Sequence, residues 1–411
     1  MLAIDVSENY TGWYLPSGEK FFTKRQVVLV YFLPEEDSVM ANPFRYGTTV
    51  EGAYFCPRPD IERQLVNYAK AGQNLVIYGE RRMGKTSLVR KAIRSLPGNR
   101  LLYVDLYYIR SLSDFCKRVM NGVADVRDRA PFLRRAAELV SRLRPTLGID
   151  ARDGTPVISI DERLAERPES LRIAMGAIEK LAKEYRLCVV FDEFQDVLKV
   201  DGNPWGMLAE MRSVIQFQGD TPYFYLGSVR NEMLKIFSDP ESPFFKSALP
   251  IEVGPIAPVD FAAFILRRFK AGGRKISSEF AAKLIGLADG VSGDVQELCD
   301  ALWERTDEDS TVGEEDLPAA MDCIFSRECG GFEAALARMT SRQMRVALAL
   351  AECPTGSIFA ADFMERAGMT NAGAMKKAVD RFVKDRLVFL KDGVYRFSNP
   401  FFKEWIKDRL G

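Results

Sequence analysis

The sequence has no histidine in its 411 residues. This absence removes the usual general base near neutral pH, the Ser-His and Cys-His nucleophile pairs, and the commonest side-chain ligand of metal ions. Any chemistry must therefore use carboxylates, lysine, arginine and a metal ion held by oxygen atoms. Phosphoryl transfer on a nucleotide requires no other groups.

Long apolar runs and net charge are missing as well. In the first 39 residues the longest apolar run is 27–33, much shorter than the about 20 residues that cross a bilayer, and no signal-peptide cleavage site is evident. Lysine plus arginine and aspartate plus glutamate number 57 each. We therefore expect no membrane partner, and any nucleic-acid partner must meet a local patch of charge.

Cysteine is present but without a structural pattern. The seven cysteines are scattered, odd in number and lack Cys-x-x-Cys spacing, which argues against a disulfide framework and a zinc site. The composition, 47% hydrophobic and 28% charged, is that of a folded soluble protein. Together these features predict a cytoplasmic protein with reduced thiols.

What the sequence does contain is a complete phosphate-binding loop (P-loop), Gly-Glu-Arg-Arg-Met-Gly-Lys-Thr at 79–86. It follows the apolar segment 74–78 and opens a helix-forming stretch, and its glycines let backbone N–H groups converge on a polyphosphate. Lys85 is expected to reach the β- and γ-phosphates as a catalytic residue, and the Thr86 hydroxyl to hold Mg²⁺. The predicted nucleotide-binding residues are Gly79, Arg81, Arg82, Met83, Gly84, Lys85, Thr86 and Ser87.

A second motif, Asp192-Glu193, ends the apolar segment 186–191. A buried strand with acidic residues at its carboxyl end is how a parallel sheet presents carboxylates to Mg²⁺. We expect Asp192 to belong to the Mg²⁺ shell and Glu193 to orient and deprotonate the attacking water. A solvated acidic turn is the plain alternative, but the position after a P-loop in an α/β pattern favours the functional interpretation.

Apolar segments alternate with helical patterns through this region, which predicts the α/β class with a parallel sheet and crossover helices. Beyond the segments already named, strands are expected at 100–106, 157–160, 223–226 and 251–253, and helices at 113–126, 131–143 and 170–185.

The strand expected at 223–226 ends at Gly227-Ser228. In proteins of this architecture a polar residue at this strand end, called sensor 1, reads the γ-phosphate. Ser228 is therefore a candidate catalytic residue, with Asn231 as the second choice. A simple cap between strand and helix is the alternative interpretation.

In this order the motifs resemble the archaeal-type ATPase family, a branch of the P-loop NTPases close to the AAA+ and STAND groups. The resemblance covers about residues 40–305 and rests on the segments 42–44, 55–58, 79–88 and 191–195, with Gly227-Ser228 adding to it. It implies a P-loop strand that lies between other strands of the sheet. It also implies ATP rather than GTP, and a helical lid behind the nucleotide.

Two features of that family are missing. Members often carry a Gly-Arg pair after the sensor helix, where this chain has Lys246-Ser247. The lid segment 290–298 also lacks the arginine that many AAA+ proteins use as sensor 2. Because an arginine finger is worth about 10³–10⁵ in rate, we expect slow turnover unless Arg230, Arg81 or a partner supplies the cation.

The C-terminal residues follow the pattern of a winged helix-turn-helix. Helical segments at 341–351, 359–367 and 371–386 precede a hairpin at 387–397, and this order resembles the terminal domain that many of these ATPases carry. Residues 335–411 hold 14 Lys and Arg against eight Asp and Glu.

This local excess of positive charge fits double-stranded DNA as a partner. The candidate phosphate contacts lie on the expected recognition helix and are Lys376, Lys377, Arg381 and Lys384. Winged helices also serve as protein-interaction or autoinhibitory modules, so a protein partner stays open.

We expect four parts: an N-terminal segment 1–39, an ATPase domain 40–256, a helical lid 257–330 and a winged-helix domain 331–411. The first part differs in character from the rest of the sequence, and we interpret it either as an extension ahead of a natural start at Met40 or as an extra hairpin.

Two functions remain open. One is a slow Mg²⁺-dependent ATPase that acts on DNA, and the other is a scaffold that holds ATP or ADP and changes protein partners. Either function is compatible with an oligomer.

Overall fold

The computed structural model describes residues 41–126, 146–149, 156–159 and 168–411. The N-terminal segment 1–39, the alternative start at Met40 and the helix expected at 131–143 lie outside the described residues. Among the residues that are described, no helix is long and apolar enough to cross a membrane.

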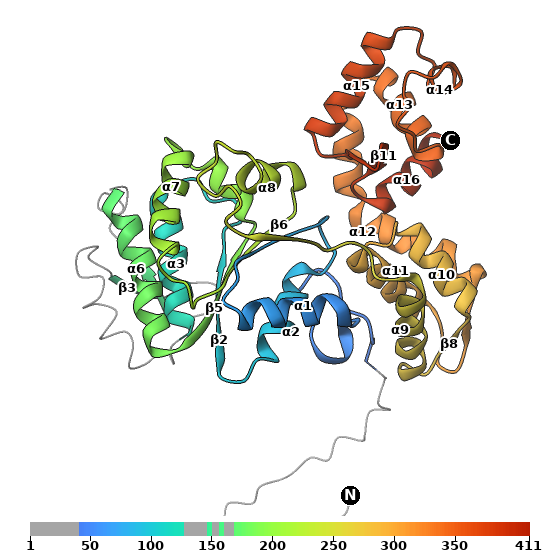
Figure 1. Cartoon of the computed structure of the whole chain (residues 1–411). Helices are drawn as coiled ribbons and strands as arrows, with labels where there is room; N and C mark the ends of the chain where they lie inside the picture. Colours follow the sequence, from blue (N-terminus) through green and yellow to red (C-terminus); the bar gives the residue numbers. More distant parts are fainter. Residues whose placement is uncertain (1–40, 127–145, 150–155, 160–167) are drawn as a thin grey trace, which may run out of the picture. The chain divides into compact units, whose positions relative to one another are not determined.

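A five-stranded parallel sheet forms the centre of the ATPase part (Figure 1). Its strands are β1 (Leu75–Tyr78), β2 (Asn99–Asp105), β5 (Arg186–Asp192), β6 (Tyr223–Gly227) and β7 (Leu249–Glu252). They lie in the order β2-β5-β6-β1-β7, so β1 has neighbours on both sides, as the resemblance implied. Because the strands are parallel, the carboxyl ends of β1, β5 and β6 meet at one edge of the sheet. The three sequence motifs leave the sheet at this edge.

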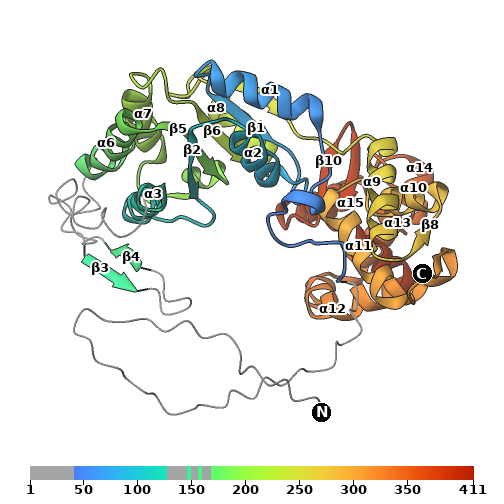
Figure 2. The same ribbon diagram turned by 90° about the horizontal axis from the view of Figure 1, so that it is seen from below.

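Helices cover both faces of the sheet (Figures 1 and 2). One face carries α1 (Pro59–Lys70) and α2 (Lys85–Arg94), and the other α3 (Leu112–Val126), α6 (Pro168–Glu184), α7 (Pro204–Ile215) and α8 (Arg230–Phe237). Along β1, Leu75 and Ile77 pack with α1 and α2, whereas Val76 and Tyr78 join the opposite core. Burial on both faces explains why these strands appear as continuous apolar runs in the sequence.

A small antiparallel hairpin, β3 (Thr146–Ile149) and β4 (Pro156–Ser159), interrupts the ATPase part. β4 agrees within one residue with the strand expected at 157–160. The sequence did not indicate β3, because Gly148 resembles a loop residue while the backbone of 146–149 pairs with β4. Two short helical turns, η1 (Gly52–Tyr54) and η3 (Phe194–Lys199), also lie in this part.

Three helices form the lid: α9 (Pro258–Ala271), α10 (Ser278–Leu287) and α11 (Ser292–Arg305). The short strands β8 (Lys275–Ile276) and β9 (Thr311–Val312) pair in parallel beside them. The segment before α1 is attached to the lid, since the Phe44 ring lies 4.8 Å from that of Phe269 and Asn42 Nδ2 donates a hydrogen bond to Asp300 Oδ1 at 2.7 Å. The segment that precedes the sheet domain in the sequence therefore contacts the lid, which follows that domain.

After the short turn η4 (Glu314–Asp316), the lid continues into α12 (Leu317–Ala337). Two adjacent glycines, Gly330 and Gly331, lie within this helix. Packing of Phe332 against the C-terminal helix outweighs the weak helix propensity of glycine. The boundary expected between 330 and 331 lies inside α12.

The winged-helix part consists of α13 (Ser341–Glu352), α14 (Ala361–Arg366), α15 (Ala372–Lys384), β10 (Val388–Lys391), β11 (Val394–Phe397) and α16 (Pro400–Leu410). β10 and β11 pair antiparallel as a wing. The sequence did not indicate α16, whose Phe402 and Trp405 rings lie 5.2 and 5.6 Å from Phe332 of α12. This aromatic contact joins the winged helix to α12.

Candidate nucleotide site

The P-loop joins β1 to α2, and its backbone needs glycine at two points. Gly84 has a φ of 80°, in the left-handed region that glycine adopts without strain. At Gly79 a Cβ atom would lie 2.3 Å from the carbonyl oxygen of Val253, which directly follows β7. Arg82 also lies in the left-handed region, at a φ of 63°. Since this conformation is unfavourable for arginine, other contacts must hold it.

Lys85 is the first residue of α2 and is only 7% exposed. Its Nζ donates hydrogen bonds to the carbonyl oxygens of Gly79 at 2.9 Å and Glu80 at 2.8 Å. Burial lowers the pKa of this ammonium, while Glu193 and Asp192 raise it. The ammonium thus lies inside the turn of the loop, where phosphate oxygens can take over the role of the two carbonyls.

Thr86 and Asp192 meet at the carboxyl edge of the sheet. The Thr86 hydroxyl donates to Oδ2 of Asp192 at 2.6 Å, and the Tyr103 hydroxyl donates to the same oxygen at 2.8 Å. Burial and then the Asp192 charge raise the pKa of Tyr103, so this phenol stays a donor. Hydroxyl and carboxylate oxygens are what Mg²⁺ accepts beside phosphate and water, so this pair fits a Mg²⁺ site.

Glu193 follows β5 in the left-handed conformation, with φ 50° and ψ 42°. Its Oε2 accepts hydrogen bonds from the Ser228 hydroxyl, at 2.7 Å, and from Nε2 of Gln195. Because two donors from different segments hold one oxygen, the carboxylate has a fixed direction beside Asp192. The structure therefore brings together the predicted residues Lys85, Thr86, Asp192, Glu193 and Ser228. Asn231, the second choice for sensor 1, has no recorded bond to this group within the described residues.

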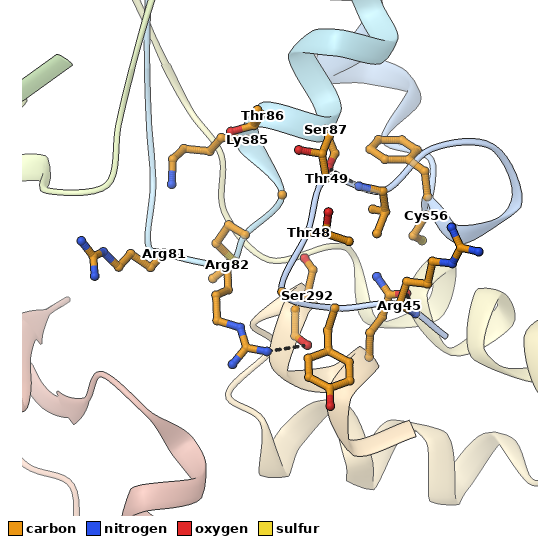
Figure 3. A pocket seen from close by; sticks show the side chains of 18 of the residues that line it. Arg45, Thr48, Thr49, Cys56, Arg81, Arg82, Lys85, Thr86, Ser87 and Ser292 are labelled. Carbon is orange, nitrogen blue, oxygen red and sulfur yellow. Dashed lines mark hydrogen bonds between the residues drawn. The ribbon is translucent and has the colours of Figure 1, made fainter. Parts of the chain in front are cut away.

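A cavity of about 610 Å³ opens beside the P-loop (Figure 3). The P-loop residues 81–87 form one wall, the segment 45–50 another, and the lid contributes Ser292, Gly293 and Gln296. The backbone N–H of Val50 donates to the Ser87 hydroxyl at 3.0 Å and ties the segment to the P-loop. Sequence reasoning missed 45–50 as lining residues, because no spacing rule connects them with the P-loop.

The two neighbouring arginines of the P-loop point in different directions (Figure 3). Arg82 extends to the lid, where its guanidinium contacts Asp294 at 2.7 Å and also pairs with Glu297. Arg81 turns away from the lid and lies 5.8 Å from the Tyr107 ring centroid. Within the described residues no ion pair is recorded for Arg81, whereas Arg230 contacts Glu252 at 3.4 Å.

Arg58 was not among the predicted site residues, although it ends one of the segments that carry the family resemblance. It is 8% exposed, and burial lowers its pKa. Its guanidinium donates to the Met83 carbonyl at 2.8 Å, to the Ser292 hydroxyl at 2.9 Å and to the Gly254 carbonyl. Arg58 thus joins the P-loop, the lid and the segment between β7 and α9.

The candidate DNA contacts all lie on α15, but they differ in their partners. Lys376 pairs with Asp380 at 2.7 Å and Arg381 with Asp385 at 2.6 Å, each along the helix. For Lys377 and Lys384 no ion pair is recorded among the described residues. Half of the expected positive face is therefore partly neutralised within the helix itself.

Two family comparisons match separate parts of the chain. Residues 69–228 match the family described as "AAA domain", and residues 330–408 match the one described as "Probable winged helix domain". No curated protein matches the chain in sequence.

Solved structures give matches over most of the chain. A Walker-type ATPase of Pyrococcus abyssi is 18% identical, with a TM-score of 0.61 over 89% of this chain and 99% of the other. The ORC2 protein of Aeropyrum pernix in ADPNP and ADP complexes is 13% identical, with a TM-score of 0.48 over 85% and 90%. The ORC1 protein of the same organism, in complex with DNA, is 13% identical, with a TM-score of 0.45 over 88% and 94%. At these identities the likeness concerns the fold alone.

The family matches and the fold confirm the resemblance drawn from the sequence. They also confirm the α/β class with a parallel sheet and a C-terminal winged helix.

Proposed function

We propose that this chain, an archaeal-type P-loop ATPase with a AAA domain and a C-terminal winged helix, binds ATP with Mg²⁺ and hydrolyses it slowly. The observation that carries the proposal is the contact between Thr86 and Asp192 at 2.6 Å, between the P-loop and the end of β5. It lies next to the buried Lys85 and the fixed Glu193. A hydroxyl, a carboxylate, an ammonium and a base at one sheet edge are the groups that nucleotide hydrolysis needs.

The expected reaction is an in-line attack of water on the γ-phosphate, in which the water oxygen bonds to the γ-phosphorus, the bond to the β,γ-bridging oxygen breaks and ADP leaves. The backbone N–H groups of the P-loop and the ammonium of Lys85 bind the phosphate oxygens and stabilise the charge that develops on them. Glu193 accepts the proton of the attacking water. Ser228 and Gln195 orient the Glu193 carboxylate through their hydrogen bonds to its Oε2. Mg²⁺, when bound by Thr86 and Asp192, supplies positive charge to the β- and γ-phosphates.

The arrangement of the arginines supports the proposal of slow turnover. Ser247 stands where the arginine of the family's Gly-Arg pair is expected, Arg82 is engaged by two lid carboxylates, and Arg230 pairs with Glu252. Arg81 lines the cavity, its guanidinium turns away from the lid, and no ion pair is found for it among the described residues. We therefore propose Arg81, or an arginine from a partner, as the source of the missing positive charge.

DNA is the proposed partner of the winged helix, with Lys377 and Lys384 of α15 contacting its phosphate backbone.

A second candidate function is the nucleotide-dependent scaffold, whose winged helix binds a protein. It is favoured by three apolar side chains on this part, Phe359, Val383 and Leu390, which are 52%, 42% and 56% exposed. Apolar exposure of this kind is more useful to a protein partner than to a phosphate backbone.

The test is phosphate release from ATP by the purified full chain, with Mg²⁺ or with a chelator. We expect phosphate release with Mg²⁺ and none with the chelator. Asp192→Asn should strongly reduce phosphate release, because it removes the carboxylate charge and keeps the shape of the side chain. ATP binding without release would favour the scaffold. Absence of ATP binding, or release that is equal without Mg²⁺, would contradict the proposal.

A further inference from the structure

The lid and the P-loop are joined by ion pairs between one arginine and two carboxylates. In this chain the arginine, Arg82, lies on the P-loop, and the acidic partners, Asp294 and Glu297, lie on lid helix α11. Both carboxylates are almost fully buried, with side chains 4% and 5% exposed, while Arg82 is 33% exposed. Charges so deeply buried need their partners, since removing one leaves the other uncompensated.

Backbone contacts reinforce this ion pair. The N–H of Gly293 donates to the carbonyl oxygen of Arg82 at 2.9 Å, and the Arg82 guanidinium donates back to the Gly293 carbonyl at 3.3 Å. A Cβ atom on Gly293 would lie 2.9 Å from the Cβ of Arg82, so helix α11 approaches the loop as closely as only glycine allows. These contacts account for the left-handed backbone of Arg82.

A second arginine joins the same two segments. Arg58 donates to the carbonyl oxygen of Met83, directly after Arg82, and to the hydroxyl of Ser292, directly before Gly293. Arg82, Ser292 and Gly293 all line the cavity beside the P-loop. The wall between loop and lid is thus closed by hydrogen bonds and ion pairs, beside the apolar core that contains Met83 and Val291.

We propose that Asp294 and Glu297 lock the lid to the P-loop through Arg82, and that opening of this lock sets the rate at which bound nucleotide leaves the site. The inference rests on the proposed nucleotide binding and adds its regulation. Arg82, Asp294 and Glu297 are positioning residues here, since they act through the loop and the lid. The lock closes one wall of the cavity, so a nucleotide in the cavity leaves faster when the lid is free.

Opening of the lock is also expected to be transmitted to the winged helix. Helix α11 packs against α12, where Asp300 of α11 pairs with Arg327 of α12 at 3.3 Å. Phe332 of α12 contacts Phe402 and Trp405 of α16. A continuous series of packed helices therefore connects the lock with the module that is proposed to bind DNA or protein.

The test is the dissociation rate of a fluorescent ADP analogue from the full chain, chased with excess ADP. Glu297→Gln is expected to raise this rate about 10-fold, which corresponds to about 1.4 kcal/mol. The double variant Asp294→Asn, Glu297→Gln is expected to raise it further. Glu297→Asp, which keeps the charge, should restore part of the slow rate. The matched control is Glu308→Gln, an exposed acid just beyond the end of α11, with an unchanged rate.

The outcomes separate the two proposals. If Lys85→Ala abolishes binding while Glu297→Gln and the double variant release the analogue within about twofold of the parent, the lock is refuted and the nucleotide site stands. If the parent binds no nucleotide, the site itself is refuted. Melting temperatures identify variants that fail to fold, and the single Glu297→Gln variant then decides the result, because it leaves Asp294 to compensate Arg82.

Discussion

The Ser228 hydroxyl donates a hydrogen bond of 2.7 Å to Oε2 of Glu193, across two neighbouring strands of the sheet. The bond fixes one oxygen of the carboxylate that we propose as the base. It also gives a physical role to a serine that the sequence marked only by its place at the end of a strand. The rate of hydrolysis should therefore depend on Ser228 even though the carboxylate itself remains.

Replacement of Ser228 by alanine removes this donor and leaves Gln195 as the second one. We predict that Ser228→Ala lowers kcat about 10-fold with little change in ATP affinity, because only the orientation of the base is affected. Steady-state phosphate release and equilibrium ATP binding give the two values. Ser213→Ala, whose hydroxyl bonds to the carbonyl oxygen of Glu210 on α7, is the control. Equal kcat in both serine variants would contradict this role of Ser228.

Lys85 offers a test of binding rather than of chemistry. Lys85→Ala removes the one lysine that the P-loop itself carries, since no other lysine lies in 79–86. We predict loss of ATP affinity by at least about 100-fold, because buried charge-assisted hydrogen bonds to phosphate are lost. Isothermal titration calorimetry measures this, with exposed Lys70→Ala as the control. Near-parental affinity in Lys85→Ala would place the nucleotide elsewhere.

The sequence predicted the sheet and the main site residues well because these features follow local rules. A P-loop is contiguous, and strands buried on both faces are continuous apolar runs. The contacts of Arg82 with Asp294 and Glu297 could not be predicted, since they join residues more than 200 positions apart. The position of Tyr103 on Asp192 depends on the register of β2 against β5, which no local pattern encodes.

The C-terminal part shows the same limit. Helical and hairpin patterns predicted α13, α15 and the wing, whereas no helix was predicted at α12, whose two adjacent glycines have weak helix propensity. Its helical form depends on packing with α11 and α16, which is information from distant parts of the chain. The partners of Lys376 and Arg381, by contrast, lie four residues away on the same helix and were open to prediction.

Asp294 predicts a pH dependence of stability. Burial raises its pKa to about 7 against the effect of Arg82, and Glu297, Glu328 and Asp289 add to the rise. The folded-state pKa lies above the ordinary value of 3.8, so the stabilisation is complete below that value and is lost as the pH rises through about 7.

We therefore expect the parent to gain about 2 kcal/mol relative to Asp294→Asn when the pH falls from about 7.5 to about 5.5. Denaturant unfolding of both proteins across this range measures the difference. Parallel pH profiles of the two proteins would show that Asp294 does not titrate there.

The winged helix gives a prediction about DNA. The double variant Lys377→Ala, Lys384→Ala should weaken binding of duplex DNA and reduce the slope of log affinity against log salt by about 2, because each lysine releases one counterion. Electrophoretic binding assays across salt measure this, with exposed Lys180→Ala on α6 as the control. No DNA binding at low salt, with or without ATP, would favour the scaffold function.

The central claim is that Glu193 acts on a nucleotide held by the P-loop, and one comparison tests it most directly. Phosphate release and ATP binding are measured on the parent and on Glu193→Gln, which keeps the size of the side chain and removes its basicity. We predict unchanged ATP binding and a fall in phosphate release of at least about 100-fold. Equal phosphate release by the two proteins would contradict the account.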